Sequence, residues 1–354
     1  MKRILLIFLS ACCFIGGFAT VKTAHAKAYT VDAEVVLEVG SGRILFEKYA
    51  DEKMYPASTT KILTAICVIE NADLNEKIKI PKAAVGVEGS SIYLREGEIL
   101  SVEELLYGLM LRSGNDAATA LALHVGKTIE SFASLMNETA KKARAENSNF
   151  VNPHGLPDDE HYVTAKDLAR ITAYALKNEA FKKIVSTKKI EISNGDMPYK
   201  RLLINKNKML FECDGATGVK TGYTKKAGRC LVSSCERGGM ELVSVVLNCP
   251  SMFETAKSHF EKYFSEYKLY KLFESDFIVD FLPTENGEKS GVYIRSDVVL
   301  PLTEYEFQNF EIRYDLPKIL QSGTKKDSEV GKMQIYVENN LIFSEKIYTI
   351  NEVD

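Results

Sequence analysis

The stretch YPASTTKILTA, residues 55–65, leads from a proline into a helix, because apolar residues recur at helical spacing from residue 62 to residue 69. Within it, Ser58 precedes Lys61 by three positions, which places both side chains on one face of that helix. Such a pair is either an ordinary solvated first turn or a nucleophile beside its base. A serine hydroxyl needs a base to become nucleophilic, and a lysine removed from water has a lowered pKa that suits this task.

Further helices are predicted downstream of this pair. Ser101 and Glu104 form a capping-box pattern for the first of them. The break SGN at residues 113–115 ends that helix, and Asp116 is expected to cap the next one. The remaining helical segments are residues 131–146, 164–178 and 251–267. Between the first two of these lies NFVNPHGLPDDEHY, a loop rich in proline, glycine and aspartate.

Strands are predicted on both sides of this helical region. Alternating apolar residues around the turn GSG at 40–42 indicate an early hairpin, and the segments GVKTGYT, GRCLVSSCER and MELVSVVLNC predict an antiparallel meander. Strand-like segments continue to the end, with Asn339-Asn340 expected to form a tight turn. The sequence therefore predicts an α+β domain over residues 27–268 and a small all-β domain over residues 269–354.

The first 26 residues have the layout of an export signal. A basic pair at residues 2–3 precedes an apolar run, and Ala24-His25-Ala26 is a small-x-small cleavage site. We expect cleavage after Ala26 and an exported, extracytoplasmic protein; lipoprotein processing at Cys12 is the alternative. Cleavage removes three basic residues and no acidic ones, so the formal net charge changes from −3 to −6. A mildly acidic exported protein is a poor candidate for binding nucleic acid.

The cysteines do not indicate a disulfide framework. Those that remain after cleavage are odd in number and irregularly spaced, although a single disulfide would be compatible with them: Cys67, Cys213, Cys230, Cys235 and Cys249. Cys67 and Cys230 lie in apolar segments and are expected to be buried. No metal site is predicted, because His154 and His161 are close together but no neighbouring Cys/His pair completes a ligand set.

Three short motifs occur in a fixed order along the chain: Ser58-x-x-Lys61, then Ser113-Gly114-Asn115, then Lys220-Thr221-Gly222. This triple resembles the penicillin-recognising serine acyl-transferases, whose motifs are S-x-x-K, S-D-N and K-T-G. The surrounding segments, from GSSIYLREGEILSVEELLYGLMLRSGNDAA to GVKTGYTKKAGRCLV, look like the D-alanyl-D-alanine carboxypeptidases among the low-molecular-mass penicillin-binding proteins. The likeness covers about residues 29–268 and implies a β-lactamase/transpeptidase-like fold, an antiparallel sheet with a helical cluster. The C-terminal segment looks like the smaller domain of that family.

The resemblance implies a reaction for the first two motifs. Ser58 would attack the carbonyl between two D-alanines of a peptidoglycan stem peptide, Lys61 would accept its proton, and Ser113 would relay protons to the leaving amine. Water would then hydrolyse the acyl-enzyme. A β-lactam would acylate Ser58 and stay there. No metal or organic cofactor would be required.

The resemblance also implies a substrate cleft. Asn115 would bind the substrate backbone, while Lys220 and Thr221 would hold the terminal carboxylate from an edge strand. Gly222, which has no side chain, would let the peptide pair alongside that strand. The backbone N–H groups of Ser58 and Tyr223 would form the oxyanion hole.

Two alternative functions remain open at this point: a β-lactamase and a catalytically silent protein that binds wall peptides. Gly114 stands where β-lactamases commonly carry Asp, and the loop at 150–162 lacks their Glu-x-x-x-Asn arrangement for deacylating water. Its acids, Asp159 and Glu160, are expected to be solvated. The presence of all three motifs argues against the silent protein.

Some residues near the motifs are expected to play no part in catalysis. Arg229 is interpreted as a surface strand residue rather than a carboxylate ligand, His154 as structural, and Lys225-Lys226 as a solvated turn. The sequence finishes in the acidic, strand-like IYTINEVD, whereas many family members finish in an amphipathic helix. Membrane association is therefore left open.

Overall fold

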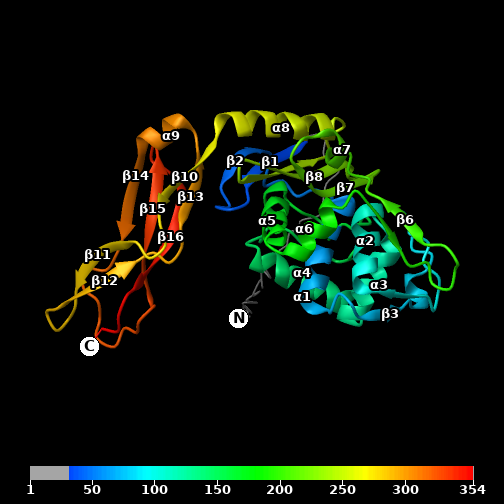
Figure 1. Cartoon of the computed structure of the whole chain (residues 1–354), viewed down its shortest axis with the longest axis horizontal. Coiled ribbons are helices and arrows are strands. Elements are labelled where there is room, and N and C mark those ends of the chain that lie inside the picture. The colour runs from blue at the N-terminus through cyan, green and yellow to red at the C-terminus, as the bar shows by residue number, and fades with distance from the viewer. Residues whose placement is uncertain (1–31, 354) are drawn as a thin grey trace, which may run out of the picture.

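The computed structural model describes residues 32–353, and its larger part is a five-stranded antiparallel sheet with helices on both faces (Figure 1). In spatial order the strands are β2 (Ile44–Lys48), β1 (Ala33–Glu38), β9 (Met240–Leu247), β8 (Gly228–Arg237) and β7 (Ala216–Thr224). The hairpin of β1 with β2 and the meander of β7 to β9 confirm two sequence predictions. Because β7 is an edge strand, one of its sides is left open.

Helices cover both faces of this sheet, which is why β1 is buried at every position instead of alternating. One face carries α1 (Lys61–Asn71), α2 (Val102–Arg112), α3 (Asn115–Gly126), α4 (Ile129–Lys142), α5 (Ala165–Leu176) and α6 (Glu179–Ser186). The other face carries α7 (Met209–Glu212) and α8 (Met252–Glu266). Val35 and Leu37 enter the first core, while Val36 between them enters the second.

Short elements complete the helical side of the molecule. They are the 3₁₀ turns η1 (Ala57–Thr60) and η2 (Lys82–Ala84), the hairpin of β3 (Lys77–Lys79) with β4 (Ile99–Ser101), and the hairpin of β5 (Lys189–Ile192) with β6 (Arg201–Ile204). Ser58 thus lies in η1, directly ahead of α1, rather than in the α-helix itself.

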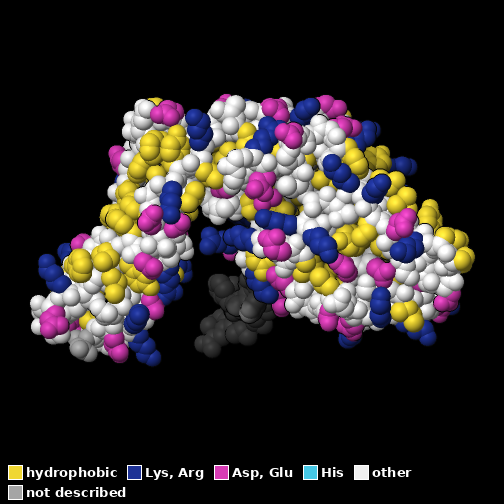
Figure 2. All heavy atoms as spheres, viewed as in Figure 1, with side chains coloured by type: hydrophobic (Ala, Val, Ile, Leu, Met, Phe, Trp, Pro, Cys, Tyr) yellow, Lys and Arg dark blue, Asp and Glu magenta, His cyan; other side chains and the backbone are white. Residues whose placement is uncertain are grey.

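The C-terminal part is a β-structure with a core of its own. It contains a two-stranded pair of β10 (Lys268–Phe273) and β13 (Val298–Leu302). It also contains a five-stranded sheet, whose strands in spatial order are β11 (Ile278–Pro283), β12 (Lys289–Tyr293), β16 (Asn340–Thr349), β15 (Glu329–Val337) and β14 (Phe310–Asp315). Its one described helix is α9 (Glu304–Asn309). Helix α8 leads into this part, and a notch separates the two parts below α8 (Figures 1 and 2).

Two local predictions are confirmed only in part. Ser101 and Glu104 form the expected capping box of α2, but Asp116 does not cap α3. Gly114 occupies that cap position, and the Asp116 carboxylate instead accepts hydrogen bonds from the backbone N–H groups of Ile92 and Leu94. Without Asp116 these loop amides would be unpaired. Binding them therefore stabilises the fold more than capping α3 would.

The last hairpin turn is shifted by one residue from its predicted position. Asn340 pairs with Val337 and begins β16, so the turn residues are Glu338 and Asn339, with φ of 50° and 64°. Positive φ at both central positions is the conformation that matches the twist of a two-residue hairpin.

The expected export signal and Cys12 lie outside the described residues. Within residues 32–353, no helix has both the length and the apolar character needed to cross a membrane. Cys67 and Cys230 are buried thiols, as the sequence predicted.

Candidate active site

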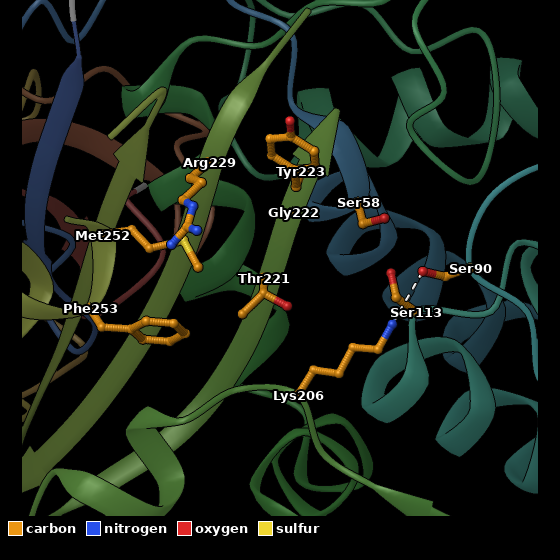
Figure 3. A pocket seen from close by; sticks show the side chains of 10 residues that line it. All are labelled: Ser58, Ser90, Ser113, Lys206, Thr221, Gly222, Tyr223, Arg229, Met252 and Phe253. Carbon is orange, nitrogen blue, oxygen red and sulfur yellow. Dashed lines mark hydrogen bonds between the residues drawn. The ribbon is translucent and has the colours of Figure 1, made fainter. Parts of the chain in front are cut away.

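The three motifs meet at a cleft of about 410 Å³ beside the edge strand β7 (Figure 3). Ser58 and Ser113 lie on one wall, and Thr221, Gly222 and Tyr223 follow one another along β7 on the other. The cleft is completed by residues from other elements: Ser90, Lys206, Arg229, Met252 and Phe253.

The Lys61 amine is the most constrained group of the site. Its Nζ atom lies 3.1 Å from Ser58 Oγ, 2.6 Å from Asn115 Oδ1 and 2.7 Å from the carbonyl oxygen of His154, and the residue is fully buried. A carbonyl and an amide oxygen can only accept hydrogen bonds. A neutral amine has two N–H bonds and one lone pair, so both hydrogens are used by Asn115 and His154. The lone pair is then directed at the Ser58 hydroxyl.

The protonation state of Lys61 agrees with this arrangement. Burial lowers its pKa well below the ordinary lysine value, and the positive charges of Lys220 and Lys206 lower it further. Asp116 acts in the opposite direction but more weakly. The site therefore favours an uncharged amine beside the serine, which is the form that can accept a proton.

The second motif supplies a hydroxyl without a partner. Ser113 has left-handed backbone geometry at the end of α2, with φ of 65°. Its Oγ atom is buried, lines the cleft and has no hydrogen-bond partner among the described residues. Asn115 is fixed on two sides, because its backbone N–H donates to Ser90 O and its Nδ2 donates to Glu88 O. A fixed Asn115 in turn orients the Lys61 amine.

The third motif lies on β7 with one lysine pointing inward. Lys220 is almost completely buried, its Nζ donates to the carbonyl oxygen of Thr221, and burial together with Lys206 lowers its pKa to about 7. Thr221 and Tyr223 are more open, and Tyr223 is 66% exposed.

Gly222 is a glycine for a reason that the sequence did not reveal. A Cβ atom there would lie 3.1 Å from the backbone nitrogen of Ser58 and 3.2 Å from the carbonyl oxygen of Pro56. The strand therefore packs directly against the turn that carries Ser58.

Two basic residues of the cleft were missed or misjudged from the sequence. Lys206 follows β6, and its Nζ donates to Ser90 Oγ at 3.2 Å across the cleft (Figure 3). Arg229, expected to be an uninvolved surface residue, lines the cleft. It stands opposite Tyr223 in the register of β7 with β8. Side chains of such a cross-strand pair share a face, so this register was the signal that would have found Arg229.

The loop at 150–162 contacts the residues that position Ser58. His161 is buried, contacts Thr60 Oγ1 at 2.9 Å and accepts a hydrogen bond from the backbone of Val151, and burial lowers its pKa to about 3. His154 contributes its carbonyl oxygen to Lys61, and burial lowers the pKa of its ring to about 4. Both rings are therefore neutral, and the structural interpretation of His154 fits.

One acid of this loop, Asp159, is exposed, as expected, and also has two partners. Asp159 Oδ1 accepts hydrogen bonds from the hydroxyl of Tyr55 at 2.8 Å and from Lys226 Nζ at 3.1 Å. The sequence placed Asp159 and Lys226 on separate solvated loops, because nothing local shows that these loops are adjacent. Within residues 32–353, no group of three or more His, Cys, Asp or Glu side chains could hold a metal ion.

Comparison with known proteins gives two family matches along the chain. Residues 20–251 match the D-alanyl-D-alanine carboxypeptidase family of S11 peptidases, and residues 267–354 match the C-terminal domain of penicillin-binding protein 5. A D-alanyl-D-alanine carboxypeptidase of Bacillus subtilis is 31% identical over 280 residues, which cover 77% of this chain and 72% of that protein. One of Haemophilus influenzae is 29% identical over 92% of this chain and 85% of that protein.

Solved structures agree with these matches. Penicillin-binding protein 5 from Haemophilus influenzae superimposes with a TM-score of 0.78 at 27% identity, over 90% of this chain and 96% of that chain. A mutant of the Streptomyces K15 DD-transpeptidase gives 0.60 at 34% identity, over 65% and 94%. With its three motifs assembled at one cleft, this chain belongs to the D-alanyl-D-alanine carboxypeptidase family of serine-type peptidases among the penicillin-binding proteins.

Proposed function

We propose that this protein removes the terminal D-alanine from peptidoglycan stem peptides through an acyl-enzyme on Ser58. The observation that carries the proposal is the position of Lys61 Nζ, which lies 3.1 Å from Ser58 Oγ and donates to Asn115 and His154, so that a neutral amine has its lone pair left for the serine proton. A base already aligned with its nucleophile needs little reorganisation before reaction.

The reaction begins with proton transfer from the Ser58 hydroxyl to Lys61. Oγ then bonds to the carbonyl carbon between the two D-alanines, and the N–H groups of Ser58 and Tyr223 stabilise the resulting oxyanion. Ser113, whose buried hydroxyl has no described partner, passes a proton to the leaving amine. D-Alanine departs, and water cleaves the remaining ester to release the shortened peptide.

The substrate's terminal carboxylate is held at the other end of the cleft. Thr221 and the exposed Arg229 line this subsite, and the buried Lys220, whose Nζ donates to the Thr221 carbonyl oxygen, adds positive charge next to it. Positive charge concentrated in a partly buried cleft favours a carboxylate strongly. Asn115 binds the peptide backbone, and Gly222 keeps the strand close to Ser58.

The same chemistry makes penicillin a covalent inhibitor. Its strained amide carbonyl reacts with Ser58, but the leaving nitrogen stays tethered to the acyl-enzyme. Among residues 32–353, the hydrogen-bond partners of Lys61 Nζ are neutral oxygens, and none is a carboxylate of the loop at 150–162. A β-lactamase, which requires rapid deacylation, is the second candidate, and a silent wall-peptide receptor is the third.

The family acts on the cell wall outside the cytoplasm. We propose accordingly that residues 1–26 are an export signal cleaved after Ala26. Residues 27–268 would then form the catalytic domain and residues 269–354 the C-terminal domain. Membrane association is a separate question, which flotation of the exported protein with vesicles would answer.

The decisive experiment measures free D-alanine released from an acyl-D-Ala-D-Ala peptide by residues 27–354, with Ser58→Ala as the matched variant. Penicillin labelling is followed by intact mass. Release that depends on Ser58 and is blocked by a persistent adduct is the expected result. A rapidly lost adduct without D-alanine release indicates a β-lactamase, and neither release nor adduct indicates the silent receptor.

A further inference from the structure

The sheet separates the five described cysteines into two groups. Cys67 and Cys230 belong to the core beneath α1 to α6, whereas Cys213, Cys235 and Cys249 belong to the core beneath α7 and α8. All five are buried thiols. A disulfide cannot form through the sheet, because its two sulfur atoms must come within about 2 Å of each other. Cys230 and Cys249 come from opposite sides of the sheet, so a bond between them would have to pass through it.

Two thiols of the second group converge on one backbone atom. Cys213 directly follows α7, and Cys235 lies on β8, opposite Ala216. The Sγ atom of Cys213 lies 3.7 Å from the carbonyl oxygen of Asp214, and the Sγ atom of Cys235 lies 3.3 Å from that same oxygen. Two sulfur atoms that share one acceptor in this way are neighbours.

The third member of this group is held elsewhere. The Sγ atom of Cys249 lies 3.4 Å from Thr255 Oγ1 and 3.7 Å from Ser251 Oγ, at the start of α8. Neither contact involves the turn at Asp214. Among the described cysteines, the geometry thus selects one pair.

A guanidinium group completes the cluster. Arg237 donates to the Asp214 carbonyl oxygen from Nε at 3.3 Å and from Nη2 at 3.2 Å, and Nη2 lies 4.0 Å from Cys213 Sγ. A carbonyl oxygen has two lone pairs, so these donors compete for it with the thiols. If both thiols lost their hydrogens, Arg237 would still satisfy the carbonyl.

We propose that Cys213 and Cys235 form a disulfide when the protein meets a disulfide oxidant outside the cytoplasm, and that this bond clamps the start of β7 to β8. Extracytoplasmic compartments are where such bonds form and persist. The closed loop, residues 213–235, contains the strand with Lys220, Thr221 and Gly222.

The chemistry balances with a low-molecular-mass disulfide such as oxidised glutathione. The thiolate of Cys213 attacks one sulfur of the oxidant and expels a glutathione thiolate. Cys235 then loses its proton and attacks Cys213 Sγ, expelling the second glutathione. The two cysteine thiols are oxidised, the oxidant's disulfide is reduced, and the two protons pass to the released thiolates. Burial raises the pKa of Cys235 to about 12.

The disulfide would act on the start of β7 and not on the reacting groups. Ala216 begins β7 two residues after Asp214, and Lys220 follows four positions later. We therefore expect the disulfide to stabilise the fold while D-alanine release changes less than about twofold. A loop of this length is associated with a rise in Tm of roughly 5–10 °C.

The test refolds residues 27–354 from urea in a glutathione redox buffer, where all five thiols are accessible and the native geometry selects the pair. The expected product is about 2 Da lighter than the reduced protein. Peptide mapping after thiol blocking is expected to join Cys213 to Cys235, and reductant is expected to lower its Tm. Cys213→Ser and Cys235→Ser each keep a donor for the Asp214 carbonyl oxygen and should abolish both effects, whereas Cys230→Ser with Cys249→Ser should retain them.

The proposal is overturned if another pair forms, if all five thiols remain free in oxidising buffer, or if Cys235→Ser still shows the reductant-sensitive Tm. Each readout is independent of D-alanine release, so a failed carboxypeptidase assay would not be confused with a failed disulfide. Folding of each variant is checked by penicillin labelling of Ser58 and by its melting curve in reductant.

Discussion

Gly155 lies against Ala57 so closely that a Cβ atom would overlap the Ala57 carbonyl oxygen. Gly155 has a φ of +83°, and Ala57 directly precedes Ser58 in the turn η1. The loop at 150–162 thus packs directly against the backbone that positions Ser58. No other residue type fits there without moving that turn.

We therefore expect Gly155→Ala to impair both stability and catalysis. The positive φ and the overlap together should lower the free energy of unfolding by about 2 kcal/mol or more, and D-alanine release should fall at least about tenfold. Gly42→Ala is the matched control, because Gly42 has a φ of +73° and open space around its Cβ. It should cost about 1 kcal/mol and leave activity unchanged. Equal activity of the two variants would refute a supporting role for Gly155.

Lys206 should set the pH range of the reaction. Its charge lowers the pKa of Lys61, which must be neutral to act as a base, and of Lys220, which must be charged to hold a carboxylate. Activity should rise as pH increases through the pKa of Lys61 and fall as pH increases through that of Lys220. Removing the charge raises both pKa values, so Lys206→Gln should shift the profile of kcat/KM to higher pH.

Lys206→Arg is the control for that experiment, because arginine keeps the positive charge and should keep the profile in place. Both variants and the wild type would be assayed from pH 5 to pH 10 with an acyl-D-Ala-D-Ala peptide. Superimposable profiles for Lys206→Gln and the wild type would show that the charge does not act on the two buried lysines.

Asn115→Asp should inactivate the base without removing it. A carboxylate at this place would raise the pKa of Lys61 and keep its amine protonated, so no lone pair would face Ser58. Acylation by penicillin at pH 7 should slow at least about 100-fold and recover as pH rises. Asn115→Ala, which adds no charge, should slow acylation without this recovery. Stopped-flow labelling across pH distinguishes them, and equal pH dependence would contradict the mechanism.

Arg43 should hold the two parts of the molecule together. It lies in the turn between β1 and β2, and its guanidinium donates to both carboxylate oxygens of Glu306 in α9 and to the carbonyl oxygen of Pro301. These side chains are largely shielded from water, with exposures of 8% and 15%. Arg43→Ala should therefore loosen the junction and speed proteolysis between residues 267 and 303, with D-alanine release from a free peptide unchanged.

Arg295→Ala is the comparison for that variant, since Arg295 pairs with Asp327 inside the C-terminal part. It should leave the proteolysis pattern as it is. Small-angle scattering would report the change in shape directly. An unchanged pattern for Arg43→Ala would mean that α8 alone fixes the arrangement.

The sequence predictions were most accurate for elements whose interacting residues lie close together along the chain. The capping box at Ser101, the strands β7 to β9 and the helix α8 depend on neighbours a few positions away, and all were predicted. The short helix α6 and the hairpin of β5 with β6 were not, because segments this short carry too little periodicity.

Local patterns missed contacts where a side chain had partners from distant segments. Asp116 could cap α3 from its local sequence, but the loop at residues 91–94 offers it unpaired amides in the folded protein. Asp159 is exposed, as predicted, but Tyr55 and Lys226 come from distant segments to bind it. Such choices are made by tertiary contacts, which no local pattern contains.

The sequence by itself determined the pairing of Ser58 with Lys61, because a spacing of three residues at a helix start brings two side chains together whatever surrounds them. Only the tertiary structure decided what that pair can do. Burial beneath β7, the acceptors from Asn115 and His154, and the positive charge of Lys220 come from segments far away in the chain. Together they remove water and stabilise an uncharged amine, since desolvation and like charge both disfavour protonated lysine.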